Sequence, residues 1–495
     1  MTVASPGLSI GADTARLKLT LDYSPSLVMH AIEGSLNAVT QQLNLTGLVT
    51  VAPDFAYVDI RALSGVQSRL GAVAGAGTVG AAATGVTGTE TGQGLNRDNE
   101  VQTSSFGLSP YVIRQFGDYG NGKIGVSANA SRYSTISGFV GNPLPTGGGT
   151  GGQTLLSTEE IAHFTTGQFL NKIQGSIDID VSQSNSVTDA ATTTTGTTST
   201  TVPATSTRSQ RQSLNNQLSY ALSHNFTLLA SAGVQKIQYT GQNQPNISGL
   251  TWNAGFTYTP GPDSSLTITY GRQNGTNAFN ANGHFAIGGR TLLTMSYANT
   301  VGTQLENLQN QLNASTINVN GQLVSAITGG PNFGAQNATG VQTGVFRFDT
   351  FNTSLSTQWE RDTFQATATW SIQTSLTPGS VQTTEFIDPA TGNLVAFTQP
   401  TSGSGQSTDT KTASLTWTHL LSPDTTLSSS ASYSLTRRPS GQGTDGALTT
   451  AISLQYSLSA STTLTGRYSF FDRVSKIPGY SIYENILLLG VTKQF

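Results

Sequence analysis

The sequence has few charged residues and no cysteine. It contains 23 Lys and Arg and 26 Asp and Glu in 495 residues, a charged fraction of 10%, whereas a water-exposed surface usually carries about 25–35%. Much of the exterior is therefore expected to face something other than water. The lack of cysteine excludes disulfides, thiolate metal sites and cysteine nucleophiles. A formal net charge of −3 offers no electrostatic basis for a nucleic-acid partner.

Long apolar runs are also missing. A membrane-spanning helix needs about 18 consecutive apolar residues, and the most apolar stretch, residues 486–491, is far shorter. Residues 1–6 lack the basic start and apolar stretch of a secretory signal. Because the fold predicted below requires export, we expect that the signal was removed from this numbering or that the start is misassigned.

Apolar and polar residues alternate with a period of two along most of the chain. For example, Ile177, Ile179 and Val181 alternate with Asp178 and Asp180. Such alternation is typical of β-strands with one apolar face. The polar positions are mainly Ser, Thr, Asn, Gln and Gly, not the Lys and Glu of a water-exposed surface. The pattern predicts about twenty strands, within a range of 18–22.

The connections between these strands are of two lengths. Short connections carry turn residues such as Pro53-Asp54 and Pro423-Asp424, and we expect them to alternate strictly with long ones rich in Gly, Ser, Thr and Asn. This asymmetry predicts an all-β fold, a transmembrane antiparallel up-and-down β-barrel with short periplasmic turns and long extracellular loops. Residues 1–14 would be an N-terminal extension and residues 15–495 a single barrel, with both termini at the short-turn rim. The predicted long loops are residues 67–103, 138–157, 185–208, 300–344 and 377–408.

Aromatic residues cluster near the ends of the predicted strands, where the interfaces of a bilayer would lie. We predict two aromatic girdles whose members include Trp252, Trp359, Trp417, Tyr258 and Tyr270.

Charged residues on the polar faces are predicted to line the lumen, which a barrel of this size makes too wide for side chains to fill. Two interpretations carry equal weight: a weakly selective aqueous path with both signs of charge, or a wet wall that merely tolerates charge. Those near the short-turn rim could instead hold a plug or a periplasmic partner. The predicted lumen-lining residues are Arg16, Lys18, Asp22, Asp59, Arg61, Lys123, Asp178 and Asp180.

Catalytic and metal-binding chemistry has little support in the sequence. Asp178 and Asp180 would lie about 7 Å apart on one strand face, within the range of glycosidase carboxylate pairs, but strand alternation alone explains that spacing. The five histidines show no metal-ligand spacing and are interpreted as incidental. We expect no enzymatic activity and no cofactor.

The longest predicted loop, residues 300–344, has internal order. Leu305, Leu308 and Leu312 have helical spacing, and residues 317–324 suggest a hairpin around Asn320-Gly321. Residues 386–389 and 392–395 suggest a second loop hairpin. The long loop is interpreted as a constriction over the lumen, or alternatively as a surface structure outside it.

Several stretches resemble outer-membrane β-barrel proteins associated with PEP-CTERM and exopolysaccharide systems, within a broader group of β-barrel porins. The resemblance implies an outer-membrane barrel near a polysaccharide-secretion system and brings no site residues with it. In addition, the terminal Phe495 resembles the signal by which the barrel-assembly machinery recognises bacterial barrels for insertion. The stretches that resemble this group are residues 21–23, 55–62, 109–111, 252–260, 266–272, 294–297 and 484–495.

Two functions remain open at this point. The first is a porin-like channel with a polar lumen that takes part in exopolysaccharide secretion or surface handling. The second is a structural or partner-binding barrel whose lumen is closed by its own loops. Expected partners are outer-membrane lipid, the barrel-assembly machinery and either exopolysaccharide or a periplasmic secretion protein.

Overall fold

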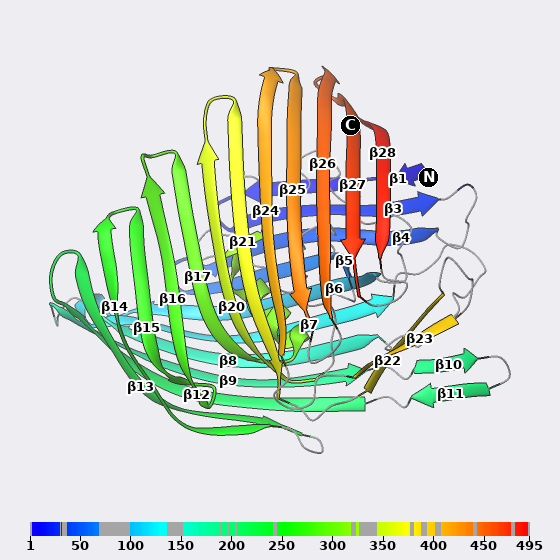
Figure 1. The fold of residues 1–495 in the computed structure, drawn as a ribbon. Helices are drawn as coiled ribbons and strands as arrows, with labels where there is room; N and C mark the ends of the chain where they lie inside the picture. Colours follow the sequence, from blue (N-terminus) through cyan, green and yellow to red (C-terminus); the bar gives the residue numbers. More distant parts are fainter. Residues whose placement is uncertain are drawn as a thin grey trace.

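The computed structural model forms one large antiparallel sheet of 22 strands. Figure 1 shows this sheet curving round, so that the early strands pass behind the later ones and cross them in projection. The structure describes residues 2–29, 31, 37–68, 100–135, 152–167, 169, 171–188, 191–195, 198–202, 205–240, 245–317, 323–325, 344–376, 381–387, 394–400, 407–438, 443–476 and 481–493.

Strands that are neighbours in the chain are almost always neighbours in the sheet, as in an up-and-down topology. The first half of the main sheet comprises β1 (Thr2–Ala4), β2 (Leu8–Asp13), β3 (Leu17–Met29), β4 (Ala38–Ala52), β5 (Ala56–Ser68), β6 (Glu100–Gln115), β7 (Gly120–Thr135), β8 (Gln153–Thr166), β9 (Ile173–Thr188), β12 (Thr205–Ala221) and β13 (Phe226–Tyr239). The second half comprises β14 (Asn246–Gly261), β15 (Ser264–Gln273), β16 (Thr276–Ile287), β17 (Thr291–Gly302), β20 (Phe346–Gln358), β21 (Asp362–Ser375), β24 (Ser407–Ser422), β25 (Thr425–Arg437), β26 (Thr444–Ser459), β27 (Thr462–Val474) and β28 (Ile482–Lys493).

Smaller elements occupy the connections between the main strands. A 3₁₀ turn, η3 (Gly117–Tyr119), joins β6 to β7, and helix α1 (Gln304–Asn313) follows β17. The strand pairing of both predicted loop hairpins is confirmed, since Ile317 pairs with Leu323 and Ile387 pairs with Leu394. The predicted turn at Asn320-Gly321 lies outside the described residues. The hairpin strands are β10 (Ala191–Thr195) with β11 (Thr198–Val202), β18 (Ser315–Ile317) with β19 (Leu323–Ser325), and β22 (Val381–Ile387) with β23 (Leu394–Pro400). Within the described part of the chain, no helix is long and apolar enough to cross a membrane.

The predicted strict alternation of short and long connections does not hold. The connections β13–β14 and β25–β26, where long loops were expected, are no longer than the β8–β9 connection on the other side, and the clearest exception lies between β15 and β16. The connection from β15 to β16 is only Asn274-Gly275, on the side where long loops were expected. Both residues have positive φ, 54° and 78°, as a two-residue type I′ hairpin requires. The Asn-Gly pair was therefore a readable turn signal that the alternation argument overlooked.

The expectation for residues 1–14 is also corrected. Instead of an extension outside the sheet, residues 2–4 and 8–13 form β1 and β2, which pair with β3. The breakers Pro6 and Gly7 interrupt the alternation here, which hid the strand from pattern analysis. Because Thr2 pairs with Met29 at the far end of β3, residue 2 lies at the long-loop rim and not at the short-turn rim. Among the described pairings, β28 pairs only with β27, and β3 pairs with β1, β2 and β4, so the described sheet keeps two edges, β28 on one side and β1 with β2 on the other.

Candidate functional site

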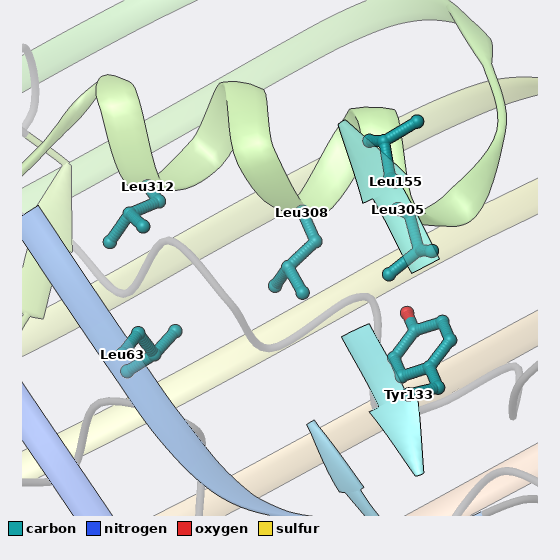
Figure 2. Packing of buried hydrophobic residues seen from close by; sticks show 6 residues of the cluster. All are labelled: Leu63, Tyr133, Leu155, Leu305, Leu308 and Leu312. Carbon is teal, nitrogen blue, oxygen red and sulfur yellow. The ribbon is translucent and has the colours of Figure 1, made fainter. Parts of the chain in front are cut away.

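Helix α1 packs against one face of the sheet, which we call the inner face and define by Leu63, Ser105 and Ser131. The helix contacts β5, β6 and β7 as well as β17. Leu305, Leu308 and Leu312 follow one side of α1 and are completely buried. Figure 2 shows them directed toward three side chains of the sheet, Leu63 of β5, Tyr133 of β7 and Leu155 of β8.

This apolar cluster explains why α1 is ordered at all. A ten-residue helix is marginal alone in water, whereas each fully buried leucine contributes roughly 1.5–3 kcal/mol. The helical spacing predicted from the sequence is thus confirmed. Residues 304–313 of the longest predicted loop are therefore docked on the inner face.

Glu306 fixes the amino-terminal end of α1. The Thr303 hydroxyl accepts a hydrogen bond from the Glu306 N–H (3.2 Å), and the Thr303 N–H donates to Glu306 Oε2 (2.8 Å), which forms a capping box. Glu306 Oε1 also accepts hydrogen bonds from the hydroxyls of Ser184 on β9 and Ser209 on β12. One carboxylate therefore caps the helix and ties it to two strands of the sheet.

Gln309 fixes the middle of α1. Its Oε1 atom accepts hydrogen bonds from Ser105 on β6 (2.7 Å) and from Ser131 on β7 (2.6 Å). Its Nε2 atom donates to Asn129 Oδ1 on β7 (3.0 Å). Gly107 permits this close approach, since a Cβ there would lie 3.3 Å from Gln309 Nε2 and 2.8 Å from Asn129 Oδ1.

Arg61 of β5 fixes the carboxyl-terminal end of α1. Its Nη1 atom donates to the backbone carbonyl of Leu312 (3.0 Å) and to those of Asn313 and Ser315. Because the last carbonyls of a helix have no partner within it and carry partial negative charge, a guanidinium is well suited to this place. Arg61 is itself held by a bidentate pair with Asp59, at 2.8 and 3.0 Å.

A cavity of about 150 Å³ lies beside the carboxyl-terminal end of α1. Its lining combines both signs of charge with an aromatic ring. Tyr111 stacks on Tyr57 with ring centroids 5.4 Å apart, and the Lys123 ammonium lies 4.4 Å from the centroid of the Tyr111 ring. The cation–π contact with Tyr111, whose ring is held by Tyr57, fixes the position of the Lys123 ammonium group. The principal side chains of the lining are Asp59, Arg61, Tyr111, Lys123, Ser127, Glu159 and Asn313.

The structure places most of the residues predicted to line a lumen on the same face of the sheet. Seven of them lie on the inner face. Residues directly opposite each other on paired strands point to the same side of the sheet, and each of the seven lies opposite a residue of the inner face. Arg16 differs, because it precedes β3 and is exposed in a bend. Only Asp59, Arg61 and Lys123 line the cavity. The seven are Lys18, Asp22, Asp59, Arg61, Lys123, Asp178 and Asp180.

Asp178 and Asp180 make different contacts. Asp178 Oδ1 contacts Nδ1 of His163 on the neighbouring β8, and the His163 Nε2 atom lies 2.6 Å from the Thr165 hydroxyl. Asp180 interacts with Glu159. His163, interpreted as incidental from sequence, thus links β8 to β9. Nucleophilic triads contain a hydroxyl, an imidazole and a carboxylate in the same order. A triad also needs an oxyanion hole, so this contact alone is not evidence for catalysis.

No group of three or more His, Asp or Glu suited to a metal ion occurs within the described ranges.

The opposite face of the sheet is apolar and exposed. On β9, Ile177, Ile179 and Val181 are each 36–44% exposed, although soluble monomers rarely expose large continuous apolar surfaces. The predicted girdle residues Trp252, Trp359, Trp417 and Tyr270 are all exposed, whereas Tyr258 is half-buried. Trp370 was not among the girdle residues predicted from the sequence, and its side chain is 42% exposed. Phe495, the predicted insertion signal, lies outside the described residues.

Comparison with known proteins finds a family match over part of the chain and a likeness in fold over the whole of it. Residues 355–495 match the family model described as "Putative beta-barrel porin 2". The closed form of the ferric-catecholate import receptor Fiu from E. coli K12 is 10% identical, with a TM-score of 0.52, over 100% of this chain and 80% of the receptor. Its open form gives 9% identity and a TM-score of 0.51, over 100% and 79%. No curated protein matches the sequence. At these identities the receptors resemble this chain in fold only.

Proposed function

We propose that this chain is an outer-membrane β-barrel of a Gram-negative bacterium that forms a polar, porin-like passage narrowed by α1. The observation that carries the proposal is the contrast between the two faces of the sheet. The outer face exposes Leu, Ile, Val and aromatic side chains, which suit the hydrocarbon of a bilayer. The inner face carries hydroxyl, amide and charged groups, which suit an aqueous lumen. The match of residues 355–495 to a porin family supports the same function.

The helix α1 serves as the constriction in this proposal. It is attached at both ends to the inner face, through Glu306 and Arg61, so it would reduce the cross-section available to a solute. The cavity beside it, with Lys123 and Glu159, would meet solutes that come from the short-turn rim, on the periplasmic side. The resemblance noted above makes exopolysaccharide the proposed cargo. Outer-membrane lipid and the barrel-assembly machinery are proposed partners.

A second candidate function has its own support. Many small polar side chains on the inner face are nearly inaccessible, among them Ser105, Ser131 and Ser434. This burial favours a barrel whose lumen is closed, with a structural or partner-binding role. Electrical recording from the purified protein in planar bilayers separates the two functions: a passage gives steady ion conductance. No conductance, even after removal of residues 300–344, would reject the passage and favour the closed barrel.

Charge reversal at Lys123 is expected to change ion selectivity. A unit charge about 4 Å from a permeating ion changes its energy by ~1 kcal/mol in water, and reversal doubles the effect. Lys123→Glu should therefore raise the cation-to-anion permeability ratio several-fold, measured as a reversal potential in a salt gradient. Lys411→Glu is the matched control, because Lys411 lies beside Trp370 on the outer face. Equal shifts in both variants would contradict a lumenal position for Lys123.

A further inference from the structure

The edge strand β28 could close the sheet against either of two strands at the opposite side, β2 or β3, and these two run in opposite directions. Successive strands from β3 to β28 are antiparallel, so β28 runs from the long-loop rim to the short-turn rim. β2 runs in that same direction, whereas β3 runs in the opposite one. A seam between β28 and β2 would thus be parallel, and a seam between β28 and β3 would be antiparallel. Only the second continues the hydrogen-bond pattern of the remaining sheet.

The length of β28 also suits β3. β28 has 12 residues and β3 has 13. Without β1 and β2, the 22 strands become 20, an even number that allows every neighbouring pair to be antiparallel. In a bilayer an open sheet edge leaves backbone groups unsatisfied, so closure is required there.

The segment that now covers β3 is held weakly. β1 and β2 keep one register on β3, with Ala4 opposite Leu27 and Leu8 opposite Tyr23. This register puts Pro6 opposite Pro25, and neither residue can donate to the ladder. The paired parts are only three and six residues long.

We propose that residues 2–13 are an exchangeable edge strand, which covers β3 in the open sheet and leaves it when β28 pairs with β3 to close a 20-stranded barrel. The inference rests on the proposed membrane location, since the bilayer is what penalises the open edge. The exchange releases residues 2–13 from the sheet. The first strand of the closed barrel is then β3, which begins at the short-turn rim. There these residues, with Arg16 and Lys18 beside them, are available to the periplasmic mouth.

Disulfide trapping tests the exchange directly, because the chain has no native cysteine. Leu489→Cys, on the outer face of β28, is combined in turn with Leu19→Cys, Leu21→Cys and Tyr23→Cys in the full chain inserted into liposomes. One of these β28–β3 pairs is expected to oxidise within the monomer. The pair Ile10→Cys with Leu21→Cys, which are partners in the open sheet, is expected to stay reduced after insertion.

The control is Leu464→Cys with Val491→Cys, which pair between β27 and β28 in either arrangement and should always oxidise. Complete oxidation of the 10–21 pair in liposomes, together with none between β28 and β3, would overturn the exchange. A disulfide from residue 489 to residue 10 or 12 would overturn it in favour of a parallel seam. A 489–489 dimer as the main product would assign the edge to a second copy. Failure of the control protein to enter liposomes at all would instead reject the proposed membrane function.

Discussion

Replacing Leu308 with aspartate is expected to increase the conductance of the protein several-fold. Leu308 is completely buried between α1 and the inner face. Loss of its packing costs about 2–5 kcal/mol, and an unpaired carboxylate in the same place adds to that cost. Because 1.4 kcal/mol is a tenfold change in an equilibrium, α1 should spend most of its time undocked. Single-channel recording in planar bilayers measures the result.

The matched control for this substitution is Asn310→Asp. It adds the same charge to the same helix, but Asn310 is exposed and lies away from the leucine cluster. Its conductance is expected to stay near that of the wild type. If Leu308→Asp inserts normally and conducts no better than Asn310→Asp, then α1 does not narrow the passage.

Replacing Leu218 with lysine is expected to destabilise the membrane-inserted protein by about 2–4 kcal/mol, the cost of a lysine near the middle of a bilayer on a lipid-facing strand. Leu218 is 52% exposed on the outer face. Leu218 pairs with Ala230, and Ala230 pairs with Ala254. Ala254 lies on β14 between Trp252 and Tyr258, so this row of residues runs between the two predicted aromatic girdles. The measurement is the free energy of unfolding in urea with the protein in liposomes.

The neighbouring residue provides the control. Gln217 points to the inner face, where its row contains Ser231 and Ser176. Gln217→Lys is expected to change the free energy of unfolding little, because water solvates a lumenal ammonium. Equal costs for the two lysines would mean that the two faces of β12 meet the same environment.

The main strands were predictable because their signal is local. On β9, each apolar residue is followed by a polar one, and a strand with two different faces needs nothing more. The leucine spacing in residues 305–312 was readable for the same reason, and the Thr303–Glu306 capping box could have been found from its sequence signature. β1 and β2 were missed because Pro6 and Gly7 divide one strand into two parts too short to show a period.

The interior contacts could not be read from local patterns. Glu306 reaches Ser184 and Ser209, which lie 122 and 97 positions away in the sequence. Arg61 was predicted to line a lumen, but its role at the end of α1 depends on a helix 251 residues downstream. The Tyr57–Tyr111 stack likewise exists only because β5 and β6 pair across a long connection. Such contacts follow from register and tertiary packing, which a single sequence does not encode in any short window.

The central claim is that the apolar face of the sheet meets lipid and the polar face meets water. Single cysteines at residues 177–181 of β9, labelled with an environment-sensitive fluorophore in liposomes that contain brominated lipid, test it most directly. Quenching is predicted at 177, 179 and 181, and reaction with a water-soluble, membrane-impermeant maleimide at 178 and 180. Quenching and reactivity that do not alternate along these five positions would contradict the claim, as would a protein that stays dissolved without detergent or lipid.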